Sequence, residues 1–320
     1  MLKYTIKKIL SMIPMILIIT FIIYGLLELT PGDPISYLMD PESLARLSDA
    51  QIEEMREAYG LNGPFVVRYF NWLFRLLQGD FGYSISSGVP VIDIIKTGLP
   101  ATLELAVASL IISTILGSIL GVVSAIYKGT IGDNVLTVFG MIGVSIPQFF
   151  FGIVAILVFA LNLEWLPVGG RTDPSVTGFF DRLEYIVLPS LVMGLSMTAG
   201  VMRYARSSML DTMNKEYIKT ARSKGLAEWR VNLLHGFRVS LTPVVVLIGF
   251  RLPTLVAGSV VIETVFQWPG IGNAFSTAVR AQNYNLVMML ALIFVVMTLF
   301  ASTLVDIVTA AIDPRVKLEN

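Results

Sequence analysis

The chain of 320 residues contains no cysteine and a single histidine, His235. Without cysteine there can be no disulfide, no thiolate metal site and no cysteine nucleophile. With one histidine, histidine-cluster metal sites and HExxH hydrolases are excluded as well. Charged residues are also scarce, at 14% of the chain compared with about a quarter in average proteins. The sequence therefore offers few of the side chains from which active sites are built.

Motifs for ATP hydrolysis and serine catalysis are missing too. No G-x-x-x-x-G-K-[ST] pattern occurs, so the chain lacks that phosphate-binding loop. Ser145, in the stretch GVSIP, would need a histidine base to act as a nucleophile, but His235 belongs to a separate basic loop. We predict that the chain is not an enzyme and binds no metal and no cofactor of its own. Its formal net charge of zero likewise indicates no nucleic-acid partner.

What the sequence has in abundance is apolar residues in long runs. They make up 55% of the chain, and the mean hydropathy is +0.75. The first run follows a basic start and is longer than the apolar core of a signal peptide, so we interpret it as a retained span. Because about 20 apolar residues cross a bilayer, we predict an all-α membrane protein with six transmembrane helices. The runs are Ile9–Leu29, Ala101–Tyr127, Val135–Asn162, Tyr185–Arg206, Leu241–Ile262 and Leu286–Ile312.

The distribution of cations predicts the orientation of these spans, since Lys and Arg near span ends are retained in the cytoplasm. The end of the fourth span and the loop after it, residues 203–240, hold eight cations and three acids, whereas residues 30–100 hold nine acids and five cations. We therefore expect a multi-pass protein of the cell membrane with a cytoplasmic N-terminus (1–8), loop (207–240) and tail (313–320). Residues 30–100 are then external, between the first span (9–29) and a five-helix core (101–312).

Three local patterns add detail to this outline. Ser48 and Gln51 form a capping-box pattern and Gly60 suits a helix end, which predicts a helix over 49–59. The stretch 64–79 is rich in aromatic residues and leucine, so it should form a helix at the membrane interface or packed on the bundle. Gly117 and Gly121 form a GxxxG pattern, which predicts close packing against another helix.

The basic loop contains the polar stretch KEYIKTARSKGLAEW, residues 215–229. On a helix, Lys215, Lys219 and Arg222 would form one cationic stripe, while Tyr217, Ala221 and Gly225 would form a second, mostly small face. The charges alone could serve topology or contact with anionic lipid. Gly225 suits the end of this helix, and a short helix with a small face also suits insertion into a groove of another protein.

Motifs along some 280 residues resemble those of the permease subunits of dipeptide and oligopeptide ABC importers. EYIKTARSKGL is similar to the cytoplasmic coupling loop of that family. The other matching stretches are LTPGDP, LLQGDFGYS, LPATLELA, GVSIPQFFFG, WLPVGGR, FQWPGIG and the terminal DPR.

The resemblance implies a type I ABC importer permease fold and a coupling helix that docks on an ATPase. The family motif, EAA followed by three variable residues and Gly, falls on Lys219, Thr220, Ala221 and Gly225, with Lys219 in place of the acid. The later part of the motif falls on His235 and Arg238 and is not matched, so Ala221 and Gly225 carry the correspondence best. The implied coupling residues are Glu216, Tyr217, Lys219, Thr220, Ala221, Arg222, Lys224 and Gly225.

The same resemblance implies partners. They are a second homologous permease in a heterodimer, two ABC ATPase subunits that bind ATP and Mg, an external solute-binding protein and the lipid bilayer. The solute would be a peptide or a related small molecule.

Two other function classes stay open at this point. An ion-coupled secondary transporter acting alone would use intramembrane acids, and the candidates are Glu28, Glu104, Glu263 and Asp306. All four fall toward span ends rather than at the midplane, which does not favour this alternative. A purely structural or lipid-scaffolding membrane protein is the third class, and it would give no reason for the motif series.

Overall fold

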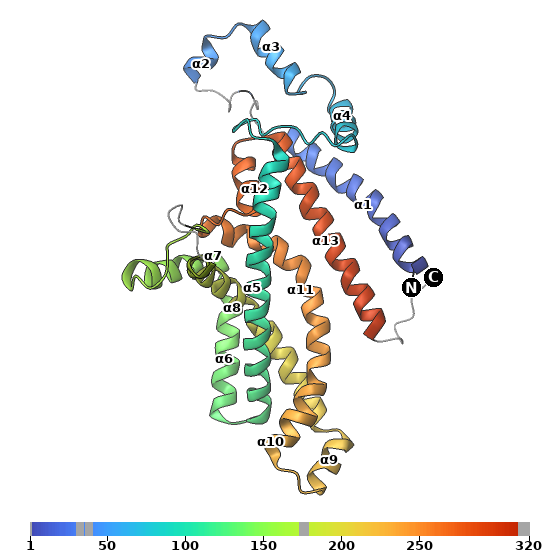
Figure 1. Cartoon of the computed structure of the whole chain (residues 1–320), viewed down its shortest axis with the longest axis vertical. Helices are drawn as coiled ribbons and strands as arrows, with labels where there is room; N and C mark the ends of the chain where they lie inside the picture. Colours follow the sequence, from blue (N-terminus) through green and yellow to red (C-terminus); the bar gives the residue numbers. More distant parts are fainter. Residues whose placement is uncertain (1, 30–34, 36–40, 173–178, 313–320) are drawn as a thin grey trace. The chain divides into compact units, whose positions relative to one another are not determined.

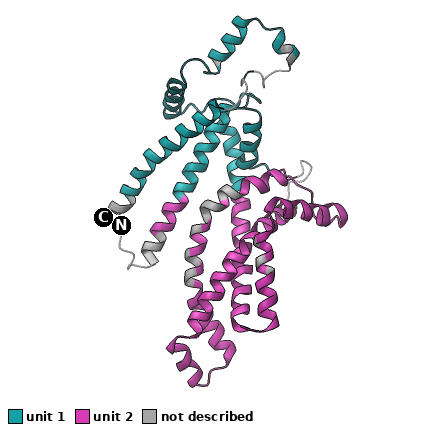
Figure 2. Cartoon of the chain, turned by 180° about the vertical axis from the view of Figure 1, so that it is seen from behind, with its two compact units in different colours: residues 1–102, 269–300 teal, residues 103–268, 301–320 magenta. Residues whose placement is uncertain are grey.

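The computed structural model describes residues 2–29, 35, 41–172 and 179–312, and every regular element in these ranges is a helix (Figure 1). The chain divides into two compact units, Met1–Thr102 with Pro269–Phe300 and Leu103–Trp268 with Ala301–Asn320 (Figure 2). The α-helices are α1 (Leu2–Glu28), α2 (Pro41–Ala45), α3 (Asp49–Ala58), α4 (Phe65–Leu77), α5 (Val91–Ile126), α6 (Ile131–Ser145), α7 (Gln148–Ala155), α8 (Phe179–Met213), α9 (Glu216–Ser223), α10 (Glu228–Arg230), α11 (Arg238–Val265), α12 (Ile271–Arg280) and α13 (Tyr284–Ile312). Two π-helices, η2 (Ile156–Asn162) and η3 (Val231–Phe237), complete the order.

Within the described residues, four helical stretches are long and apolar enough to cross a membrane: Ile6–Glu28, Val91–Ile126, Arg182–Met213 and Tyr284–Ile307. They confirm a helical membrane protein and correspond to the first, second, fourth and sixth predicted spans. The predicted fifth span falls within α11. The count of six spans and the external placement of residues 30–100 stay predictions.

The predicted third span is not a single helix. Helix α6 ends at Ser145, and α7 begins at Gln148 and continues into η2. Between them, Ile146 adopts an extended conformation with φ −84° and ψ 126°. The cause is Pro147, because a proline ring disfavours helical geometry at the residue before it. Figure 1 shows α7 running in a different direction from α6.

The first unit is held together by apolar and aromatic packing around the start of α13. Val91 and Ile95 of α5 pack with Ile271 of α12 and with buried residues of α13. In a second cluster, Tyr24 of α1 and Tyr69 of α4 pack with Met288 and neighbouring aromatic residues. Helix α4 therefore packs against α1, which is one of the two placements predicted for this stretch.

Helix α3 confirms the prediction made from its sequence. The Ser48 side chain accepts a hydrogen bond from the Gln51 backbone, and the Gln51 side chain accepts one from the Ser48 backbone. Gly60 follows the helix with a positive φ of 66°, a conformation that favours glycine. The helix thus begins and ends where its capping residues predicted.

The second unit is centred on α8, which packs against α5, α6, α7 and α11. The GxxxG pattern of α5 makes the close contact that was predicted. A Cβ added at Gly117 would lie 2.9 Å from the Thr198 carbonyl oxygen of α8, and one added at Gly121 would lie 2.5 Å from that of Met202. Only glycine allows the two backbones to approach this closely.

Candidate functional site

The stretch 215–229 lies in a small helical module between α8 and α11, formed by α9, α10 and η3 (Figure 1). The module has its own apolar core of Ile218, Ala221 and Val231, with Met213 and Leu226 packed against it. Ile218 and Val231 are fully buried. A short polar helix is therefore held firmly by side chains that all come from its own neighbourhood in the sequence.

Gly225 ends α9, as its sequence predicted. Its φ is 74°, and its amide donates to the Arg222 carbonyl at 2.9 Å, while the amide of Leu226 donates to the Ala221 carbonyl at 3.4 Å. This is the left-handed helix end that glycine favours, since other residues are strained there. The turn returns Leu226 to the core of the module.

The cations of this helix are balanced by acids of the same module. Lys219 Nζ lies 2.8 Å from a Glu216 carboxylate oxygen. Arg222 makes two hydrogen bonds to Glu228, at 2.9 and 3.3 Å. The expected cationic stripe is thus locally neutralised at two of its three positions, which weakens the electrostatic attraction that it could exert on a partner.

The expectation that Ala221 lies on an outward small-residue face is wrong. Ala221 is 7% exposed and packs inside the module, because its helical position is three residues from the buried Ile218. The outward row of α9 instead contains Tyr217, Thr220 and Lys224, which are exposed. Gly225 is also exposed, and Glu216, Lys219 and Arg222 carry the ion pairs described above.

A buried ion pair joins α5 and α6 to α8, the helix that leads to this module. Arg206 of α8 contacts both carboxylate oxygens of Asp133, at 2.8 and 3.1 Å. Ser124 of α5 donates to the same carboxylate at 2.5 Å, and the amide of Gly129 donates at 3.0 Å. The Asp133 side chain is 5% exposed. The network fixes the ends of α5 and α6 to α8, and no local sequence pattern indicates it.

Hydrogen bonds from Arg206, Ser124 and Gly129 hold the pKa of Asp133 well below its usual range. A carboxyl group whose pKa is lowered by folding stabilises the fold at pH values above its unfolded pKa of about 3.9. That stabilisation is lost as the pH falls through the folded value. The network is therefore fully formed at neutral pH.

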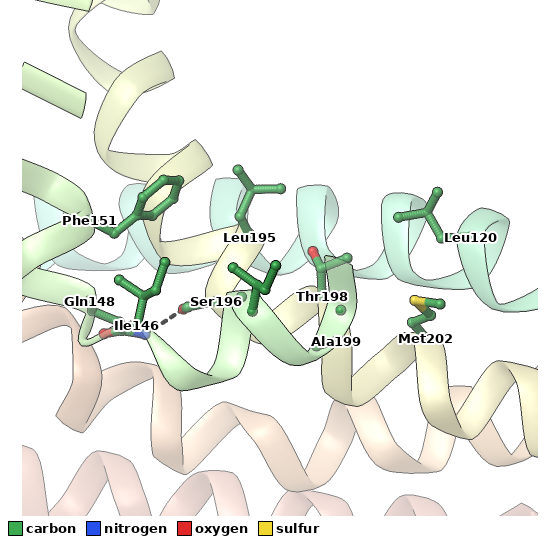
Figure 3. Close-up of a pocket in the computed structure, with 12 residues that line it drawn as sticks. Leu120, Ile146, Gln148, Phe151, Leu195, Ser196, Thr198, Ala199 and Met202 are labelled. Carbon is green, nitrogen blue, oxygen red and sulfur yellow. Dashed lines mark hydrogen bonds between the residues drawn. The ribbon is translucent and has the colours of Figure 1, made fainter. Parts of the chain in front are cut away.

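A cavity of about 120 Å³ lies beside the break between α6 and α7 (Figure 3). At one end, the amide of Gln148 donates to the Ser196 hydroxyl at 2.5 Å. Its walls come from α5, α6, α7 and α8 and are mostly apolar: Leu120, Gly140, Ile142, Gly143, Ile146, Phe151, Leu195, Thr198, Ala199 and Met202. The space suits a small apolar group rather than a charged one.

The acids considered for ion coupling have interaction partners within the protein. Glu28 forms an ion pair with Arg68, and Glu104 pairs with Arg171 at 2.7 Å. Glu263 is buried and Asp306 is half-buried, and both have interaction partners in the structure. Among the described residues, no group of three or more His, Asp or Glu side chains could hold a metal ion.

Comparison with known proteins gives matches over the whole chain. A family model described as "Binding-protein-dependent transport system inner membrane component" matches residues 117–318, and the corresponding N-terminal model matches residues 1–106. The chain is 39% identical to the oligopeptide transport system permease protein AppB of Bacillus subtilis (strain 168), over 99% of this chain and 100% of the relative. It is 33% identical to the glutathione transport system permease protein GsiC of Escherichia coli (strain K12), over 99% of both chains.

Two solved structures share the fold. One is an amino acid ABC transporter with histidines, with a TM-score of 0.52 and 13% identity, covering 69% of this chain and 94% of the other. The second is the inward-facing MetNI methionine ABC transporter, with a TM-score of 0.52 and 18% identity, covering 70% and 98%. The fold is thus that of ABC importer permeases, and the chain belongs to the family of inner-membrane components of binding-protein-dependent transport systems.

Proposed function

We propose that this chain is the transmembrane permease subunit of an ATP-driven importer for peptides or related small solutes. It forms half of the translocation pathway, and a second homologous permease forms the other half. Two ATPase subunits hold ATP and Mg, and an external solute-binding protein delivers the solute. Both termini and the α9 module face the cytoplasm. The names of the full-length relatives support this solute class and favour it over a stand-alone ion-coupled carrier.

The observation that carries the proposal is the packed module around α9. Movement of an ATPase can reach the membrane helices only through an element that does not deform. Because Ile218, Ala221 and Val231 form a closed core, α9 can move as one body with the ends of α8 and α11. The exposed row of Tyr217, Thr220 and Lys224 is the surface that we assign to the ATPase. Ala221 and Gly225 support this surface by shaping the module.

Substitution of Thr220 by tryptophan tests this assignment. The side chain is exposed and bonds only to its own helix, so the variant should insert and fold. We expect Thr220→Trp to lose co-purification with the ATPase subunits and to lose ATP-driven uptake. Thr97→Trp is the matched control, because Thr97 is an exposed helical threonine of the other unit that also bonds only to its own helix.

Retention of the ATPase subunits by Thr220→Trp would contradict the docking surface. Uptake by liposomes that contain this chain alone, driven by an ion gradient and sensitive to Asp306→Asn, would contradict the importer itself. The two outcomes are distinguishable because the first concerns one surface and the second concerns the energy source.

A further inference from the structure

Helix α11 carries an arginine in the middle of an apolar run. Arg251 lies at the centre of the predicted span 241–262, and neither this span nor the span 185–206 contains an acidic residue. A charge at that depth is costly unless it faces water or a counter-ion. No ion pair between described residues involves Arg251. Neither of these two spans therefore supplies a counter-charge for it.

The position of Arg251 on α11 places it on the side that faces α8. Val244, Ile248, Arg251 and Leu255 follow helical spacing along one stripe, and Val244 and Ile248 pack with Val201 and Ala205 of α8. Leu255 is 1% exposed, while Arg251 is half-buried. The charged side chain thus interrupts an otherwise apolar contact stripe and stays partly accessible.

Helix α8 makes room for this side chain. A Cβ added at Gly200 would lie 2.2 Å from Nη2 and 3.2 Å from Cζ of Arg251, so the guanidinium rests directly on the α8 backbone. Arg203 follows one helical turn later on the same face of α8 and is exposed. Two guanidinium groups are therefore presented on neighbouring helices without an acid in either predicted span.

We propose that Arg251, assisted by Arg203, binds the carboxylate of the transported solute inside the membrane. The planar guanidinium fork matches a carboxylate with two parallel hydrogen bonds, and this match is specific to arginine. A free carboxyl terminus is a group that every unmodified peptide carries. The proposal rests on the proposed function, because it assigns one chemical group of that solute class to one site.

The first experiment asks whether Arg251 faces water. Because the chain has no cysteine, Arg251→Cys introduces a single thiol into this subunit. We expect a charged, membrane-impermeant methanethiosulfonate reagent to label it in the assembled importer, whereas Leu255→Cys, buried on the same stripe, should stay unlabelled. An Arg251→Cys variant that is as unreactive as Leu255→Cys would overturn the site.

The second experiment separates carboxylate binding from a structural role. Proteoliposomes with the complete importer receive short alanine peptides either with free carboxyl termini or as C-terminal amides. Each variant is compared with the unaltered importer for the same peptide, which removes any preference of the binding protein. We expect Arg251→Gln to lower uptake of the free acids about ten-fold but to lower uptake of the amides less than about two-fold. Arg251→Lys, which keeps the positive charge, should restore part of the uptake of the free acids.

Arg280→Gln, an exposed arginine of α12, is the matched control and should leave the uptake of both peptide forms unchanged. Equal losses for acids and amides in Arg251→Gln would show that the arginine has a structural role independent of the solute carboxylate, and would overturn the solute site. Absence of ATP-driven uptake of either form by the unaltered importer would instead contradict the proposed function for peptides.

Discussion

Two of the polar segments of this apolar chain are held in place in opposite ways. In the first unit, the loop 80–90 is anchored by Asn283, whose amide donates to Ser84 at 2.8 Å and Ser86 at 3.2 Å and whose oxygen accepts from the Ile85 amide. In the second unit, the α9 module is anchored by an apolar core. The loop depends on hydrogen bonds across some 200 residues of sequence, whereas the module depends on side chains within about 20 residues.

The two kinds of anchor predict different responses to substitution. Buried hydrogen bonds are directional, so removing one partner leaves several groups unsatisfied together. Apolar contacts are non-directional, so the cost of a deletion grows with the volume removed. The stability of the loop should therefore depend on one side-chain amide, whereas the stability of the module should depend on the size of one buried side chain.

The largest effect is expected for Asn283→Leu. The substitution leaves the Ser84 hydroxyl and the Ile85 amide without their buried partner, which should lower the free energy of opening of the loop by about 4 kcal/mol. Hydrogen exchange of residues 80–90 measures this loss. Asn285→Leu is the control, because the Asn285 amide also donates to the loop, at the Phe81 and Tyr83 carbonyls, but is only half-buried, so that its loss should cost about 1 kcal/mol. Equal effects of the two variants would contradict the special role of Asn283.

A somewhat smaller effect is expected for Ile218→Ala. Truncation of this fully buried side chain leaves a cavity in the module, and the free energy of opening should fall by about 3 kcal/mol. Hydrogen exchange of residues 213–231 gives the measurement. Tyr217→Ala, the exposed neighbour, should change it by less than about 0.5 kcal/mol. If Tyr217→Ala destabilised the module as much as Ile218→Ala, the assignment of its inner face would be wrong.

Gly225→Ala should have a moderate effect on the same module. No atom lies within 4 Å of an added Cβ, but the φ of 74° is unfavourable for alanine, so we expect a loss of about 1 kcal/mol. Hydrogen exchange of residues 213–231 again reports it. Gly129→Ala is a comparable glycine with a φ of 80° and no atom within 4 Å, and it should leave the module unchanged. An unaltered module in Gly225→Ala would contradict the strain argument.

The smallest effect is expected for Lys219→Ala. Lys219 and Glu216 form an exposed pair three residues apart, and such pairs contribute less than about 0.5 kcal/mol. Thermal unfolding of the purified chain should show no resolvable shift at moderate salt. A large shift would mean that the position at which the family motif has an acid is important for the fold of the module.

Features predicted correctly from the sequence depend on residues close together in the chain. The capping box of α3 and the positive φ of Gly225 belong to this class, because a few neighbouring side chains set the backbone conformation. The close packing at Gly117 and Gly121 also followed from their spacing on a helix. In the candidate site, the end of α9 was predicted correctly, and Ala221 was placed on the wrong face.

The features that the sequence analysis missed depend on contacts between distant segments. Ala221 is buried because Val231 closes the core of the module, and helical spacing alone does not say which face will be covered. Asp133 and Arg206 lie 73 positions apart in the sequence, and no local pattern predicts that they pair. Arg251 was visible as a cation inside an apolar run, yet only its contact with Gly200 shows where its guanidinium lies.

Hydropathy and local backbone preferences act over a few turns, so the sequence alone predicts a helical membrane protein and the capped helix α3. Its motifs also indicate the family that the chain resembles. Contacts between distant segments bury Ala221 and attach Asn283 to a loop some 200 residues away. These outcomes depend on which surfaces meet when the chain folds, and no local pattern contains that information.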